Sequence, residues 1–128
     1  MTRRRQQAEA FGRWAEYLAV LMLVLKGYRI HAHRARTAAG EIDLVAQRGE
    51  VLAFVEVKAR STIARAREAL SLHQSRRLTR AAAIWRSGRP SLHPLAIRYD
   101  LVLVAPWRWP VHERAAWLPE EAIARDLL

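Results

Sequence analysis

The chain has 128 residues, the usual length of one folded unit, and we expect residues 1–128 to form a single domain. It contains no cysteine, which excludes disulfide frameworks, thiolate metal sites and cysteine nucleophiles and fits a cytoplasmic protein. Apolar residues make up 52% of the chain, too many for a disordered tail, and the formal net charge of +10 favours nucleic acid as the partner.

The first predicted element is a helix over residues 8–26, because apolar side chains recur there at helical spacing. The polar and basic residues 1–7 before it are expected to be frayed. The apolar run inside this helix is too short to span a bilayer, so we expect a buried helix and no membrane partner. Glu16 is the one charged residue between Arg13 and Lys26. It is either a surface acid paired with Arg13 or a carboxylate that leans toward a functional site.

Three strands are predicted next. Residues 28–33 form the first, residues 34–39 form a polar loop, and residues 40–45 and 54–60 form a hairpin. The hairpin turn over residues 47–50 is polar and contains a glycine, which is typical of such turns.

This hairpin carries three charged residues on otherwise apolar strands: Asp43, Glu56 and Lys58. With the turn centred on residues 48 and 49, Asp43 falls opposite Phe54 and lies diagonally from Glu56, at a backbone separation of roughly 7–8 Å. A slip of one residue would put the two carboxylates on opposite faces. Two interpretations remain open. The charges either face solvent as ordinary surface charges or bind one metal ion, which would offset the cost of placing charges on such strands.

Two carboxylates and a lysine on one face suit a metal-dependent phosphodiesterase. Asp43 and Glu56 would hold Mg²⁺ or Mn²⁺ through hard oxygen ligands and leave positions for water and a phosphate oxygen. The ion would lower the pKa of the bound water, and Lys58 would orient that water or stabilise charge in the transition state. The five histidines do not cluster at zinc-site spacings, so zinc is the less favoured metal.

The later part of the chain predicts a connective segment over residues 61–67, a helix over 72–86, a strand over 95–105, an edge strand over 111–118 and a helix from Pro119. The whole order is α-β-β-β-α-β-β-α, which predicts an α/β fold with a mixed sheet flanked by helices. Asp100, at the start of an apolar strand, is expected to be a structural hydrogen-bond acceptor.

Basic residues bracket the hairpin in sequence. Residues 65–98 hold eight arginines and one acid, and residues 26–39 hold four basic residues and no acid. We expect a phosphate-binding surface, with an ordinary solvated face as the alternative. Gln74 either reaches a phosphate or a metal-bound water, or is structural. The residues expected to contact nucleic acid are Arg36, Arg60, Arg76, Arg77 and Arg80.

The sequence GEIDLV at residues 40–45, followed by FVEVKAR at residues 54–60, resembles the YraN-like family of the PD-(D/E)XK restriction-endonuclease-like superfamily, which is similar to archaeal Holliday junction resolvases. The likeness covers residues 12–104, roughly. It implies a restriction-endonuclease-like α/β fold. Junction-cutting relatives work as dimers, so a homodimer is one option for this chain, whose oligomeric state the sequence leaves open. The residue roles that it implies are metal ligation by Asp43 and Glu56, catalysis by Lys58, and auxiliary roles for Glu16 and Gln74.

The favoured hypothesis is a Mg²⁺- or Mn²⁺-dependent endonuclease that acts on DNA, including branched or damaged DNA. A second hypothesis is a nucleic-acid-binding protein with an inactive nuclease-like fold. A third is a small basic protein that docks on other proteins through Trp107 and Trp109, two side chains that could instead stack on bases.

Overall fold

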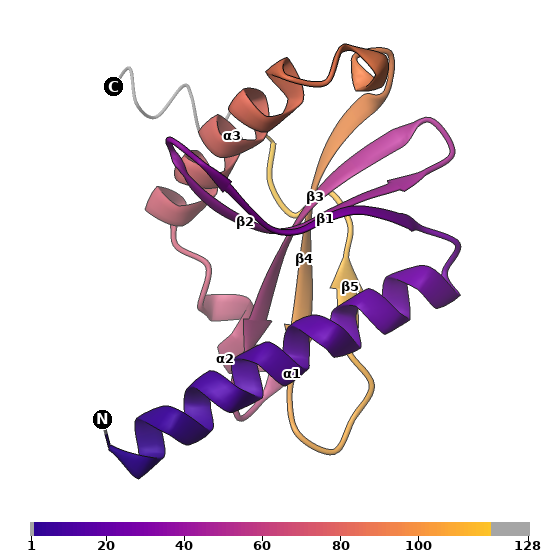
Figure 1. Ribbon diagram of the computed structural model, residues 1–128. Helices are drawn as coiled ribbons and strands as arrows, with labels where there is room; N and C mark the ends of the chain where they lie inside the picture. Colours follow the sequence, from indigo (N-terminus) through magenta and orange to yellow (C-terminus); the bar gives the residue numbers. More distant parts are fainter. Residues whose placement is uncertain (1, 119–128) are drawn as a thin grey trace.

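The computed structural model describes residues 2–118 and contains a five-stranded sheet of order β1-β2-β3-β4-β5 (Figure 1). Neighbouring strands are antiparallel except β3 and β4, which are parallel. The predicted α/β class, with a mixed sheet flanked by helices in a restriction-endonuclease-like layout, is confirmed. The predicted helix from Pro119 lies outside the described residues. The elements in chain order are α1 Arg3–Leu25, β1 Arg29–Thr37, β2 Gly40–Arg48, β3 Val51–Ala59, α2 Ile63–Glu68, α3 Leu72–Ser87, the 3₁₀ turn η1 Pro90–Leu92, β4 Ala96–Val104 and β5 Val111–Glu113.

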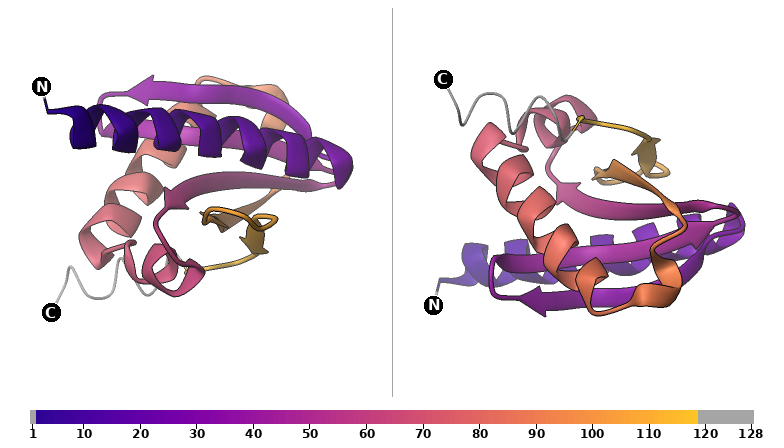
Figure 2. Two further views of the ribbon diagram at one scale, coloured as in Figure 1. Left: turned by 90° about the horizontal axis from the view of Figure 1, so that it is seen from below. Right: turned by 90° about the horizontal axis from the view of Figure 1, so that it is seen from above.

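Helices α1 and α3 cover opposite faces of the sheet (Figure 2). The sheet divides its side chains between two cores because successive residues of a strand point to opposite faces. Under α1, Leu44 and Val55 pack with Ala19 and other helix residues. Under α3, Phe54 packs edge-on against Trp85, with ring centroids 5.9 Å apart.

Helix α1 begins at Arg3, so the prediction of a frayed segment is wrong for residues 3–7. Thr2 is the N-cap, and its hydroxyl accepts a hydrogen bond from the Arg5 amide at 3.2 Å. The prediction of a buried helix holds for one side of α1 only. That side buries Ala15, Ala19, Met22 and Leu23, whereas large apolar residues on the other side remain exposed. No helix within residues 2–118 is long and apolar enough to cross a membrane.

Strand β1 extends to Thr37, so the predicted polar loop over residues 34–39 is wrong. The strand continues because β2 offers it a partner along its whole length, from Gln47 opposite Arg29 to Gly40 opposite Thr37. The pairing is irregular between Ile30 and Ala32, and Arg34 has a positive φ of 56°. Such a backbone is uncommon for a residue other than glycine, and it interrupts the regular pleat of β1.

The β2–β3 turn is centred on Gly49 and Glu50, one position later than predicted, because Arg48 pairs with Val51. Gly49 has a φ of 59°, in the left-handed region that glycine adopts without strain. Moving the centre by one position shifts the pairing by two residues, so each side chain stays on its predicted face. Asp43 therefore comes level with Glu56 instead of Phe54.

The remaining boundaries agree with the sequence in part. Helix α3 and strand β4 closely match the predicted ranges 72–86 and 95–105. The prediction of a connective segment over residues 61–67 is wrong in part, because that range contains most of α2, whose N-cap Thr62 accepts from the Arg65 amide. The predicted edge strand over residues 111–118 is limited to Val111–Glu113.

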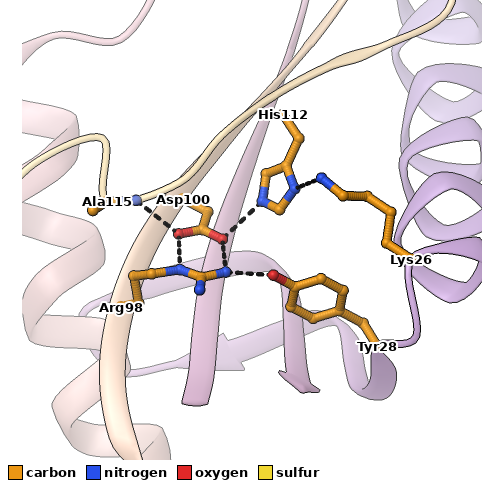
Figure 3. Close-up of polar contacts among 6 residues, drawn as sticks. All are labelled: Lys26, Tyr28, Arg98, Asp100, His112 and Ala115. Carbon is orange, nitrogen blue, oxygen red and sulfur yellow. Dashed lines mark hydrogen bonds and ion pairs between the residues drawn. The ribbon is translucent and has the colours of Figure 1, made fainter. Parts of the chain in front are cut away.

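A buried carboxylate ties β5 and the end of α1 to β4 (Figure 3). Asp100 is fully buried and accepts hydrogen bonds from Arg98, from His112 at 2.8 Å and from the Ala115 amide at 3.1 Å. Arg98 also donates to the Tyr28 hydroxyl, and His112 contacts Lys26 through Nδ1. Burial acts to raise the pKa of Asp100, but these hydrogen bonds outweigh it and lower the pKa to about 2. The expected structural role of Asp100 is confirmed.

Replacement of Asp100 by alanine is expected to destabilise the fold by about 3–5 kcal/mol, because it leaves a half-buried arginine without its partner. The variant Tyr28→Phe removes one hydrogen bond of the same network and should cost only about 1 kcal/mol. Urea denaturation of both variants at neutral pH measures the difference. Equal, small losses would contradict a network organised around Asp100.

Candidate active site at a fork in the sheet

Strands β2 and β3 separate in the middle of the sheet. Their pairing runs from Arg48 and Val51 to Leu44 and Val55. Beyond Leu44, β2 continues beside β1 as far as Gly40. Strand β3 continues beside β4 as far as Ala59. The two strands therefore form a fork, and the residues where they part are Asp43 and Glu56.

Asp43 replaces the missing strand partner at this fork. Its Oδ2 atom accepts a hydrogen bond of 2.8 Å from the Val57 amide, which β2 no longer pairs. A buried amide without a partner costs free energy, so the carboxylate stabilises the fork as well as facing the site. This contact fixes the Asp43 side chain beside the Glu56 carboxyl, close enough for the two groups to affect each other's pKa.

Glu56 and Lys58 share one face of β3, as predicted from their spacing. The Lys58 Nζ lies 3.5 Å from the Glu56 Oε1. Both side chains are largely enclosed, with 11% of Lys58 and 18% of Glu56 exposed. The structure thus brings Asp43, Glu56 and Lys58 together at the fork.

Glu16 approaches the same place from α1. Its carboxylate is not paired with Arg13, the surface alternative considered above. It accepts from Arg34, with Nη2 at 2.6 Å, and lies 3.4 Å from His33 Nε2. The irregular backbone of Arg34 directs its side chain toward α1. Sequence reasoning missed Arg34 because it assigned this residue to a loop.

The charges at the fork perturb one another. Burial raises the pKa of Asp43, the Val57 amide works against this rise, and the Glu16 charge adds to it. Burial and then the Asp43 charge raise the pKa of Glu56 to about 8, although Lys58 favours the ionised form. Two neighbouring carboxyls with raised pKa values indicate a site where a bound cation would stabilise the ionised form of both.

A cavity of about 560 Å³ opens over these residues, between β3 and the first half of α1. Its walls contain Asp43, Glu56, Lys58 and Glu16, together with three arginines: Arg13, Arg34 and Arg60. Of the residues predicted to bind nucleic acid, Arg60 is therefore at the cavity. Arg13 was not predicted to be there, and the helical register of α1 was the only sequence signal that could have placed it beside Glu16.

The other predicted site residues lie away from the cavity. The Gln74 side chain accepts from the Ser71 amide at 3.1 Å and closes a capping box at the start of α3. Arg77 reaches the first residue of β2, since a Cβ added to Gly40 would lie 3.2 Å from its Cδ. Arg36 is exposed near the β1–β2 turn and lies 3.8 Å from Glu41. Arg76 and Arg80 also belong to α3.

The loop from β4 to β5 begins beside the cavity, because the Arg60 amide donates to the Val104 carbonyl at 3.0 Å. Trp107 in this loop is fully exposed, and Trp109 is about half exposed. Neither tryptophan contributes to the core, which leaves both available for an external contact.

Comparison with known proteins places the chain in a family. Residues 15–104 match the family described as "Uncharacterised protein family UPF0102". The chain belongs to the UPF0102 family. A UPF0102 protein of Maricaulis maris is 66% identical over 128 residues, which is all of both chains. A UPF0102 protein of Chelativorans sp. is 54% identical over 108 residues, covering 84% of this chain and 87% of that protein.

The matched UPF0102 region contains the whole fork. Within residues 2–118, no group of three or more His, Asp or Glu side chains is placed to hold a metal, which disfavours zinc. Mg²⁺ needs fewer protein ligands, because it keeps several waters and is commonly held by one or two carboxylates together with substrate phosphate. Asp43 and Glu56, adjacent and enclosed in a cavity, fit that requirement.

Without divalent ions, the stability of this UPF0102 protein is expected to fall as pH rises from about 4.5 to about 8. In that window the folded protein holds a proton on Glu56 that the unfolded chain has released, so a higher pH favours unfolding. Glu56→Gln stays uncharged and should be more stable than the wild type at high pH by roughly 1–3 kcal/mol. Urea denaturation in EDTA measures the free energy of unfolding of both proteins against pH. The matched control is Glu50→Gln, because Glu50 lies in the exposed β2–β3 turn.

Mg²⁺ is expected to raise the melting temperature more above the Glu56 pKa of about 8 than two units below it, because carboxylates must lose their protons to bind. At 100 times its dissociation constant, the ion should add about 2.7 kcal/mol of stability. Asp43→Asn should abolish the shift and Glu50→Gln should retain it. An equal shift in all three proteins would contradict a site at the fork.

Proposed function

We propose that the chain is a divalent-metal-dependent nuclease that cleaves phosphodiester bonds in DNA. The observation that carries this proposal is the convergence of Asp43, Glu56 and Lys58 at the fork, inside a cavity that also contains arginines. The proposal includes membership of the PD-(D/E)XK superfamily, whose paired acid and acid-x-lysine motif these residues match.

Asp43 and Glu56 would hold Mg²⁺ or Mn²⁺. Such an ion, when bound, polarises a phosphate oxygen and lowers the pKa of a water molecule. The Lys58 ammonium, 3.5 Å from Glu56, supplies positive charge where negative charge develops on the phosphate, in an enclosed place where it is weakly screened. Glu16, held by Arg34, adds a carboxylate to the same wall and can orient water.

Arginines around the fork supply the binding charge. Arg13, Arg34 and Arg60 line the cavity itself. Arg36 and Arg77 extend the basic surface to the β1–β2 turn and to α3. Contacts of this kind hold the phosphate backbone without reading sequence, so the proposed substrate is defined by its shape and charge.

Cleavage assays test the activity on duplex, single-stranded and four-way-junction DNA, with matching RNA, in Mg²⁺ or Mn²⁺. We expect Asp43→Ala and Lys58→Ala each to lower the cleavage rate by about 100-fold or more while DNA binding persists. The control is Lys26→Ala, which removes the chain's other lysine, outside the cavity. DNA binding by the wild type without cleavage in any metal would instead support an inactive nuclease-like binder.

DNA affinity is expected to fall steeply with salt, through release of counterions from the phosphates. Arg36→Ala should weaken binding several-fold and reduce the slope of log affinity against log salt by about 1, as loss of one phosphate contact does. Arg29→Ala is the matched control, since it lies at the opposite end of β1 and removes the same charge. Fluorescence anisotropy over a salt series measures both, and equal effects would show that only net charge matters.

A further inference from the structure

Helix α1 has a second apolar face, turned away from the sheet. We call it the outer stripe, and each of its five residues is at least 50% exposed: Trp14, Tyr17, Leu21, Val24 and Leu25. The left-hand view of Figure 2 looks onto α1, and no other part of the described chain lies in front of it. The stripe is the largest gathering of exposed apolar side chains on any helix of residues 2–118.

The composition of α1 makes this exposure unusual. From Trp14 to Leu25 the only charged residue is Glu16, and its carboxylate is turned toward Arg34 and the cavity. A helix that is apolar on all sides is normally buried on all sides. The sheet covers only one side of α1, so the sequence provides for an interface that residues 2–118 of one copy do not complete. Contiguous apolar surface of this kind marks an interaction site.

We propose that a second copy of the chain covers the outer stripe, with the two α1 helices packed antiparallel about a two-fold axis. Residues 14, 17, 21 and 24 alternate spacings of three and four, the pattern by which paired helices interlock side chains. A two-fold interface uses the same patch twice, so one self-complementary stripe suffices. In the antiparallel arrangement, Tyr17 meets Leu21 of the second copy and Trp14 meets Val24.

Charge distinguishes a second copy from other occupants. Nucleic acids and anionic lipids are bound through lysine and arginine, and the stripe contains neither. Arg13 lines the cavity and Lys26 contacts His112, so the basic residues at the two ends of the stripe are directed elsewhere. Two chains of charge +10 repel each other, and this uncharged stripe lets them meet without bringing arginines together.

Antiparallel packing has two physical advantages over parallel packing. It sets the two helix dipoles head to tail, and it separates the arginine-rich starts of the two helices, residues 3–5. It also leaves the catalytic proposal unaffected, because Gly12 and Glu16 line the cavity on a different side of α1.

Sedimentation velocity tests the dimer. The wild type is expected to have twice the chain mass at concentrations of tens of micromolar, and Leu21→Glu is expected to have the mass of one chain. Ile84→Glu is the matched control, because Ile84 is a 44% exposed apolar residue on α3, and it should remain dimeric. Circular dichroism and melting curves establish that both variants are folded.

Cross-linking tests the orientation, since the chain has no cysteine of its own. A mixture of Tyr17→Cys and Leu21→Cys should form disulfide-linked dimers several-fold faster than either variant alone. Faster linkage within a single variant would overturn the antiparallel arrangement.

A wild type that stays monomeric up to about 100 µM would overturn the proposal, as would a dimer that Leu21→Glu leaves intact. Binding of the monomer to anionic phospholipid vesicles, lost in Leu21→Glu, would assign the stripe to a lipid surface and would likewise overturn it. None of these outcomes depends on whether the protein cleaves DNA.

Discussion

The parting of β2 from β3 is the constraint on which the rest of the structure depends. Each strand keeps its outer neighbour, so the sheet opens without losing its continuity. The opening leaves the Val57 amide without a strand partner, and the Asp43 carboxylate accepts its hydrogen bond. One side chain therefore completes the backbone hydrogen bonding and also faces the cavity. The fold and the candidate site share that contact.

The fork carries an energetic cost that the surroundings offset. Two acids and a lysine lie largely out of water. Burial raises the pKa of both acids, and the Asp43 charge raises the pKa of Glu56 further. The apolar cores on both faces of the sheet stabilise the fold and so offset the cost of these buried charged groups. The Asp100 network is different, because hydrogen bonds satisfy its carboxylate and lower its pKa. A buried acid whose hydrogen bonds lower its pKa indicates structure, whereas two neighbouring acids with raised pKa values indicate a place for a ligand.

The sequence predicted the class of fold and the strand faces well. The alternation of apolar and charged residues fixes which face each side chain occupies, and a change of register by two residues does not alter that face. It therefore brought Asp43 and Glu56 to one place even though the turn was displaced. It could not predict the path of Arg34, whose positive φ is uncommon for a residue other than glycine. Gln74 was predicted as a site residue, but its side-chain amide instead caps helix α3. Ser71 lies three residues before it, which is the spacing of a capping box.

Strand β1 lies at an edge of the sheet, where a row of free amides and carbonyls would ordinarily invite another strand. Two features break that row: the irregular pairing near Ile30 and the positive φ of Arg34. The exposed arginines of β1 place charge along the same edge. Chains that meet edge to edge would therefore find neither a regular ladder nor a neutral surface. This irregularity, which helps to form the cavity, should also protect a concentrated solution of the protein from fibrous aggregation.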